Sequence, residues 1–138
     1  MRSRAPLALM EQTVMVLVFA LAAALCLRAF ALADGISRRV EATDRAVLWA
    51  ESAADTLKAR QGDLSRAAAE LGGEFDGQRW TILLDENWQE TAEKPAYTLT
   101  ARPVQTGQPL LGRTQIDVAE KNGESLFSLE VCWQEAGA

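Results

Sequence analysis

An uncharged apolar run near the N-terminus is the feature that most constrains this chain. Between Thr13 and Leu27 there is no charged residue, no glycine and no proline. This run of 15 residues is shorter than the ~20 that an α-helix needs to cross a bilayer core. Extension through Arg28 to Ala33 gives 21 residues, because arginine can lie along a helix and reach the interface. The sequence therefore predicts a transmembrane helix within residues 1–33 and a water-facing domain at 34–138.

Charge separates the same two regions. The chain carries 14 Lys+Arg and 19 Asp+Glu, of which three and one lie within residues 1–33. Residues 34–138 therefore hold 11 basic and 18 acidic residues, a net charge of −7. A domain this acidic is a poor candidate for nucleic-acid binding, so we expect no nucleic-acid partner. Arg2 and Arg4 precede the apolar run, and the positive-inside rule then predicts a cytoplasmic N-terminus with the domain outside the cell membrane.

The fate of the N-terminal segment is open at the level of sequence. Ala31-Leu32-Ala33 fits the pattern before a signal-peptidase site at Asp34, which would make the segment a cleaved secretory signal. Glu11 ahead of the apolar run and Arg28 within it are atypical of such a signal. Helical sequence also continues past Ala33, so we favour a retained anchor.

From residue 34 to 61 the apolar residues recur at spacings of three and four, which indicates an amphipathic helix. No proline separates it from the apolar run, so we predict one helix from about Leu7 to Arg60. Gly62 is expected at its C-terminal cap, and Asp63 should cap a short helix over 63–71. The predicted apolar arc consists of Ile36, Val40, Ala42, Thr43, Ala46, Val47, Trp49, Ala50, Ala53, Ala54 and Leu57.

Beyond Gly77 the period of the apolar residues falls to two, which predicts antiparallel strands between residues 79 and 134. Trp88–Gln89 is the candidate start of a short return strand, which Glu93-Lys94-Pro95 breaks. Asn122-Gly123 predicts a hairpin with positive φ at both positions. One face of the sheet is apolar, and the helix arc is its natural partner. The predicted fold class is α+β: a long N-terminal hydrophobic helix continuing into an amphipathic helix packed on an antiparallel sheet of four or five strands.

Chemically reactive constellations are missing from the sequence. The chain has no histidine, which removes the commonest general base and metal ligand, and it has neither a phosphate loop nor a dinucleotide motif. We therefore expect no catalytic, cofactor-binding or metal-binding residues, no small-molecule substrate and no enzymatic activity. Cys26 and Cys132 fall in different regions and are not expected to pair. Trp88 has little pattern around it, and an exposed Trp88 would be a candidate ligand contact.

Glu11 stands at the edge of the apolar run, four residues after Leu7. A carboxylate at that depth either stays in the headgroup region or pairs with a positive group. The stretch Leu7-Ala8-Leu9-Met10-Glu11-Gln12-Thr13-Val14, behind a short basic leader, resembles the N-terminus of type IV pilins and type II secretion pseudopilins. If the mature chain begins at Leu7, Glu11 is its fifth residue, as in that family. Pro6 stands where the family has a glycine, and Leu7 where phenylalanine is usual.

The resemblance implies a β-sheet head packed on the second half of the N-terminal helix. It also implies a non-enzymatic, single-pass membrane protein that serves as a structural or assembly subunit of a secretion or pilus-like system. In the family the glutamate pairs with the N-terminal amine of a neighbouring subunit, so Leu7 and Glu11 become candidate subunit-interaction residues. The implied partners are membrane lipid and other pilin-like subunits or secretion-system membrane components. The alternative is an exported small α+β binding module of unknown ligand.

Overall fold

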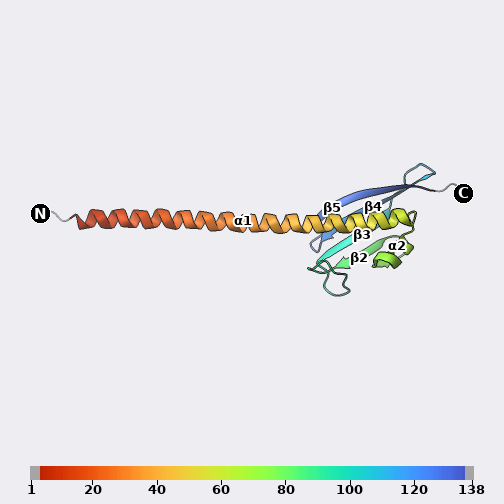
Figure 1. Cartoon of the computed structure of the whole chain (residues 1–138), viewed down its shortest axis with the longest axis horizontal. Coiled ribbons are helices and arrows are strands. Elements are labelled where there is room, and N and C mark those ends of the chain that lie inside the picture. The colour runs from red at the N-terminus through yellow and green to blue at the C-terminus, as the bar shows by residue number, and fades with distance from the viewer. Residues whose placement is uncertain (1–3, 136–138) are drawn as a thin grey trace. The chain divides into compact units, whose positions relative to one another are not determined.

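The structure is a computed structural model that describes residues 4–135. It confirms the α+β class, with two helices followed by a five-stranded antiparallel sheet. The chain divides into two compact units between Val40 and Glu41. The division predicted at residues 33 and 34 rested on hydropathy and stays a prediction. In chain order the elements are α1 (Ala5–Ala59), α2 (Leu64–Leu71), β1 (Glu74–Phe75), β2 (Trp80–Leu84), β3 (Tyr97–Pro103), β4 (Leu111–Glu120) and β5 (Ser125–Gln134) (Figure 1).

The sheet is a simple meander, because the strand order β1-β2-β3-β4-β5 is also the order along the chain. In β2, β3 and β4 the buried positions alternate with more exposed ones, as expected for strands with one covered face. The register brings buried residues of neighbouring strands opposite one another, as in Ile82↔Leu99 and Leu99↔Val118. The period of two read from the sequence therefore predicts the apolar face correctly.

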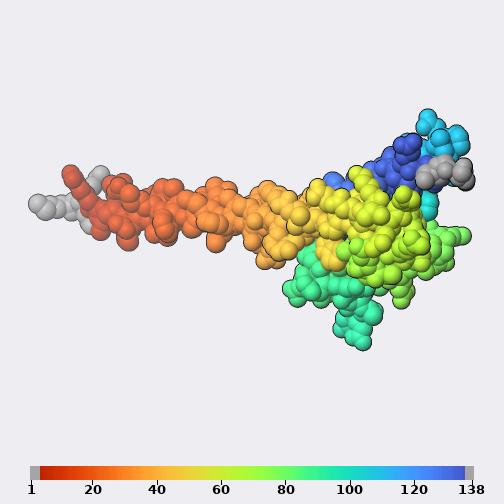
Figure 2. Space-filling view, turned by 45° about the vertical axis from the view of Figure 1, so that its right-hand side comes forward, coloured from red at the N-terminus to blue at the C-terminus, as the bar shows by residue number. Residues whose placement is uncertain are grey.

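That apolar face packs against α1 within the unit that begins at Glu41. The helix contributes small side chains, and among its buried residues only Leu57 is larger than alanine. The sheet contributes large ones, including Trp80, Ile82 and Ile116, each fully buried. Figure 2 shows the last part of α1, from Glu41 onward and mostly yellow, lying against the rest of its unit. The buried alanines of α1 are Ala42, Ala46, Ala50, Ala53 and Ala54.

The buried part of α1 is shorter than the predicted arc. Ile36 and Val40 were expected to pack on the sheet, but they are 64% and 54% exposed. Burial begins at Ala42, and Val47 is only half-buried. Periodicity identifies which face of a helix is apolar, but it does not show where along the axis a packing partner begins.

A Schellman motif ends α1 and corrects the predicted cap. The N–H of Gly62 donates to the carbonyl oxygen of Leu57 at 2.8 Å, while Gln61 takes the left-handed conformation with φ of 52°. Gln61 thus occupies the position where glycine is most common, and Gly62 follows it with φ of 80°. Asp63 caps α2 as predicted, accepting the N–H of Arg66 at 3.1 Å.

The short return strand expected to begin at Trp88–Gln89 is reduced to a single bridge at Glu90. Trp88 has φ of 60° and lies in a turn that the Asp85 carboxylate holds together. That carboxylate accepts the N–H groups of Asn87 and Gln89 at 2.8 Å and 3.0 Å. The segment makes only an isolated bridge between Leu84 and Glu90. The fifth strand is instead β1, which pairs with β2 and begins before the expected start at residue 79.

The hairpin between β4 and β5 forms where predicted, with a different turn. Gly123 has φ of 88°, whereas Asn122 is not among the described residues with positive φ. The N–H of Gly123 donates to the Glu120 carbonyl at 2.8 Å, and Glu120 N–H donates to the Glu124 carbonyl at 2.9 Å. The loop is therefore three residues long with a left-handed glycine at its end, a common alternative to the two-residue turn.

Substitution of a core alanine by leucine tests the close fit between α1 and the sheet. Ala50 is fully buried, and the added side chain would have to displace the large residues of the sheet. We expect Ala50→Leu to lower the free energy of unfolding by about 1–3 kcal/mol. Ala59→Leu, on the exposed end of the same helix, is the matched control and should change it by less than about 0.5 kcal/mol. Thermal unfolding of the full chain in detergent, followed by near-UV circular dichroism, measures both; equal stability of the two variants would contradict this packing.

Candidate functional site

The most unusual surface of the described chain is that of α1 from Leu7 to Ala33. An 18-residue window of this helix has a mean hydropathy of 2.5, and none of it is buried. Phe19 and Phe30 are 76% and 75% exposed. A helix that is apolar on all sides is covered by lipid or by other helices in its working environment. The helix is long and apolar enough to cross a membrane.

Two charged residues of opposite sign interrupt this apolar surface. Glu11 and Arg28 are the only charged residues between Ala5 and Ala33, and both are exposed. They lie seventeen residues apart, which is about 25 Å along the axis and about 100° around it. Within residues 4–135 neither side chain forms a hydrogen bond or salt bridge. Each charge therefore needs water, a headgroup or a partner from outside this chain.

The two predicted interaction residues share one face of α1. Leu7 and Glu11 are one turn apart and border the same shallow depression, which Arg4, Ala8 and Val14 also line. Leu7 is 71% exposed, and the Glu11 carboxylate is also open to the surroundings. The structure thus leaves both residues accessible to a neighbour, and their role in subunit contact stays a prediction.

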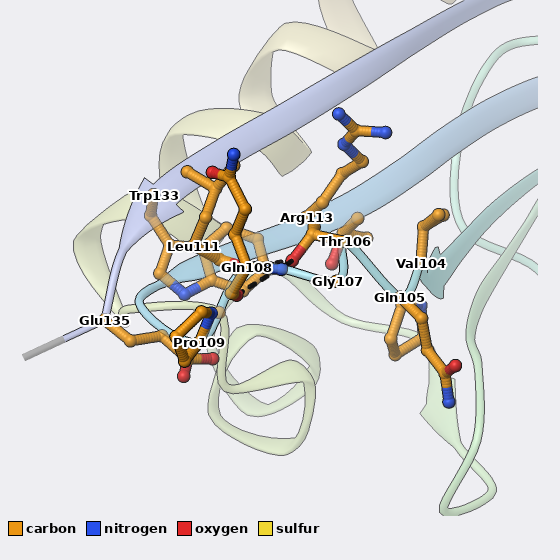
Figure 3. A pocket seen from close by; sticks show the side chains of 14 residues that line it. Val104, Gln105, Thr106, Gly107, Gln108, Pro109, Leu111, Arg113, Trp133 and Glu135 are labelled. Atoms are coloured by element: carbon orange, nitrogen blue, oxygen red, sulfur yellow. Dashed lines mark hydrogen bonds between the residues drawn. The ribbon is translucent and has the colours of Figure 1, made fainter.

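Sequence reasoning missed a hollow of about 600 Å³ on the head. The loop between β3 and β4 borders it, and Figure 3 shows Gln108, Pro109 and Leu111 gathered around Trp133. The indole of Trp133 lies against Gly62 and Gly112, and a Cβ atom added to either glycine would overlap the ring. The only sequence signal of this arrangement is Gly112 inside β4, because a glycine within a strand often marks a site where another group packs closely on the backbone.

Arg113, Thr114 and Trp133 supply polar atoms at the wall of the hollow. The Arg113 side chain points away from Trp133 (Figure 3) and lies 3.7 Å from Glu130 across the strand pair. Trp133 Nε1 and Thr114 Oγ1 are buried without a hydrogen-bond partner among the described residues. Within residues 4–135 no group of three or more acidic or cysteine side chains could hold a metal ion.

Trp88 is buried, which corrects the expectation that it could be an exposed ligand contact. Its side chain is 9% exposed and stacks on Tyr97 with the ring centroids 3.9 Å apart. Its φ is positive, in the turn after β2. Trp88 therefore presents little accessible surface to a ligand. Cys26 and Cys132 are both exposed and are free thiols in the structure, and the expectation that they do not pair stays a prediction.

Two titrating groups of the head have shifted pKa values. Burial raises the pKa of Tyr97, and the carboxylates of Glu120, Glu86 and Glu41 raise it further by repelling the phenolate. The pKa of Asp76 is lowered because its carboxylate accepts the backbone N–H groups of Arg79 and Gln78, both at 2.8 Å. Asp76 is fully exposed in a turn before β2, so its shift reflects turn geometry and not a reactive site.

The comparisons with known proteins add no family. No family model matches the chain, and neither curated proteins nor solved structures give a match.

Titration of Tyr97 tests the electrostatics of the head directly, because it is the only tyrosine of the chain. We expect tyrosinate absorbance to rise with a midpoint above the ordinary 10.0. A raised pKa means that the protonated phenol contributes stability below pH 10, which is lost as the pH rises through the folded-state pKa. Glu120→Gln should lower the midpoint, whereas Glu93→Gln, which is not among the carboxylates that raise this pKa, should leave it unchanged. A wild-type midpoint at or below 10 would contradict this environment.

A double-mutant cycle tests the contact between Gly112 and Trp133. Gly112→Ala should lower the free energy of unfolding by about 1–3 kcal/mol, because the new methyl group overlaps the indole. In a Trp133→Ala background the same change should cost less than about 0.5 kcal/mol, since the overlapping ring is gone. Equal costs in both backgrounds, measured by thermal unfolding, would show that the two residues do not touch.

Proposed function

We propose that this chain is a non-enzymatic, single-pass membrane protein of pilin or pseudopilin type. It acts as a structural or assembly subunit of a secretion or pilus-like system, and it associates with similar subunits through the first part of α1. The observation that carries the proposal is the exposure of α1 on all sides from Leu7 to Ala33, where 0% of the apolar window is buried. An apolar surface of this kind is stable only when lipid or neighbouring helices cover it.

Retention of the anchor is favoured by the continuity of α1. The helix runs through Ala33 and Asp34 without a break, and Asp34 forms a salt bridge with Arg38 one turn later at 3.1 Å. A signal-peptidase site would have to unwind here before cleavage. Arg2 and Arg4 precede the apolar segment, so the proposed orientation has the N-terminus in the cytoplasm and the head outside.

The head provides the second candidate function, an exported α+β binding module. The observation in its favour is the hollow beside Trp133, which combines an aromatic ring with the amide side chains of Gln105 and Gln108. Such a mixture of apolar and polar groups is common in binding sites. The hollow is shallow, however, and its unpartnered polar atoms are buried below its surface. The anchored subunit is therefore the better supported function.

Fractionation of expressing cells, followed by intact mass measurement, separates these two functions. The anchored subunit should stay in the membrane fraction after an alkaline wash. Its mass should equal that of the full chain or of a chain that begins at Leu7. Soluble protein that begins at Asp34 would contradict the proposal and leave the exported module.

Removal of the Glu11 charge tests subunit association. We expect Glu11→Ala to reduce recovery of a differently tagged second copy from detergent-solubilised membranes by roughly 5- to 30-fold, as the loss of 1–2 kcal/mol would. The reason is that a carboxylate within an assembly of apolar helices is stabilised only by a positive partner. Gln12→Ala, at the neighbouring exposed position, is the control and should leave recovery unchanged. Undiminished recovery of Glu11→Ala would argue against a pairing role, while membrane retention of both variants shows that insertion is intact.

A further inference from the structure

The last strand of the sheet, β5, has one free edge. It stands at one end of the strand order (Figure 1), and within residues 4–135 it pairs only with β4. β5 is ten residues long, whereas β1 at the opposite edge of the sheet has two. A long edge strand offers a row of unpaired backbone N–H and C=O groups to another extended chain.

The hydrogen-bond register shows which residues of β5 direct their backbone groups to the free edge. The N–H of Glu135 donates to the carbonyl oxygen of Leu110 at 2.9 Å, so Glu135 bonds on the β4 side. Successive residues of a strand bond on opposite sides, so Gln134 directs its N–H and C=O away from β4. This alternation continues back to Ser128, because the register shift of the β4–β5 pair lies nearer the hairpin. The outward-facing residues, all exposed, are Ser128, Glu130, Cys132 and Gln134.

β5 lacks the residues that usually protect an edge strand from pairing. Proteins guard such edges with proline or with charged side chains, lysine above all, and β5 contains no proline, lysine or arginine. Its apolar residues Phe127, Leu129 and Trp133 pack against the core but stay partly exposed. A further strand along this edge therefore satisfies the free backbone groups and covers apolar surface at the same time.

The charge at this edge favours a basic partner. Glu130 is the only charged residue of β5, and its side chain is 50% exposed although Arg113 Nε lies 3.7 Å from its carboxylate. Glu135, directly after β5, is also exposed. Opposite charges on neighbouring strands attract, and like charges repel. A second copy would bring another acidic edge and another head with a net charge of −7 at residues 34–138, so it is the poorer partner.

We infer that β5 is a docking edge for an extended, basic segment of another protein, which joins the sheet as one more antiparallel strand. The apolar side chains of this segment cover Phe127 and Leu129. Its lysine or arginine side chains lie on the opposite face of the sheet, beside Glu130. The inference goes beyond the proposed function and does not require assembly through the first part of α1.

A synthetic strand tests the docking edge on the full chain in detergent micelles. The probe is a peptide of alternating valine and lysine with blocked ends, as long as β5, and the charge control alternates valine and glutamate. Hydrogen exchange of Ser128, Glu130, Cys132 and Gln134, followed by NMR, should slow by about tenfold with the lysine peptide, as the formation of one hydrogen bond to each N–H predicts. The residues between them, which already bond to β4, should not change. The glutamate peptide should leave all of these rates unchanged.

Backbone methylation of the peptide separates strand addition from electrostatic attraction alone. In an antiparallel pair the residue opposite Glu130 exchanges both hydrogen bonds with it and lies on the same face, so it is a lysine of the probe. N-methylation of the lysine backbone nitrogens should therefore weaken binding by about tenfold or more. N-methylation of the valine nitrogens, which point away from β5, is the matched control and should have little effect. Equal binding of all three lysine peptides would overturn strand addition.

Charge reversal in the protein tests the choice of partner. Glu130→Lys should weaken binding of the lysine peptide by about tenfold and strengthen binding of the glutamate peptide, because the attraction across the strands is reversed. Glu93→Lys changes the net charge equally at an exposed position in the loop after β2, and it should leave both affinities unchanged. Equal effects of the two substitutions would show that the peptide responds only to the net charge of the head, which would overturn the site.

The remaining outcomes concern the occupant of the edge. Slow exchange of the four outward-facing N–H groups without peptide, increasing with protein concentration, would show that a second copy pairs with β5 and would overturn the basic partner. Protection by neither peptide would overturn the docking edge itself. None of these results changes the membrane fractionation or the intact mass, so the proposed function is judged separately.

Discussion

The head depends on one packing constraint, which is the complementarity between a row of alanines on α1 and large side chains on the sheet. Alanine gives the helix its best intrinsic propensity and leaves space for Trp80, Ile82 and Leu99, which are fully buried. Most of the apolar volume of the core thus comes from the sheet, and the position of the strands decides where the helix can lie. The same helix carries larger apolar residues before Glu41, where the described chain leaves them exposed. Side-chain size along α1 therefore distinguishes the segment that packs on its own sheet from the segment whose apolar residues are exposed in the described chain.

The architecture could be predicted from the sequence because it depends on local periodicity. Spacings of three and four predict α1, and alternation predicts the strands with their apolar face. The errors occur where a distant residue decides the conformation. Trp88 is buried and stacks on Tyr97. Nothing in the sequence indicates that these two residues are in contact. The two-residue strand β1 exists only because β2 lies beside it, and its own composition gives no strand signal.

The candidate sites also differ in whether they could be predicted from the sequence. Leu7 and Glu11 could be placed from sequence, because one turn of a helix separates them and no tertiary contact intervenes. The hollow on the head could not, since its wall joins Trp133 to Gly62 and Gly112, which are far apart along the chain. A glycine in a strand signals that something approaches closely, but it does not identify the approaching ring. The raised pKa of Tyr97 could not be predicted from sequence either. The three carboxylates that raise it come from α1, from the turn after β2 and from β4.

The meander order of the strands affects how the chain folds during its synthesis. Every strand pairs with its neighbour in sequence, so each hairpin can close as soon as its second strand leaves the ribosome, with little loop-closure entropy to overcome. The alanine face of α1 is made first and is covered only after β2, β3 and β4 exist. Until then the nascent chain exposes two apolar surfaces of α1, one before Glu41 and one after it. One is later covered by the sheet of the same chain, whereas the other, on α1 before Glu41, stays exposed in the described chain.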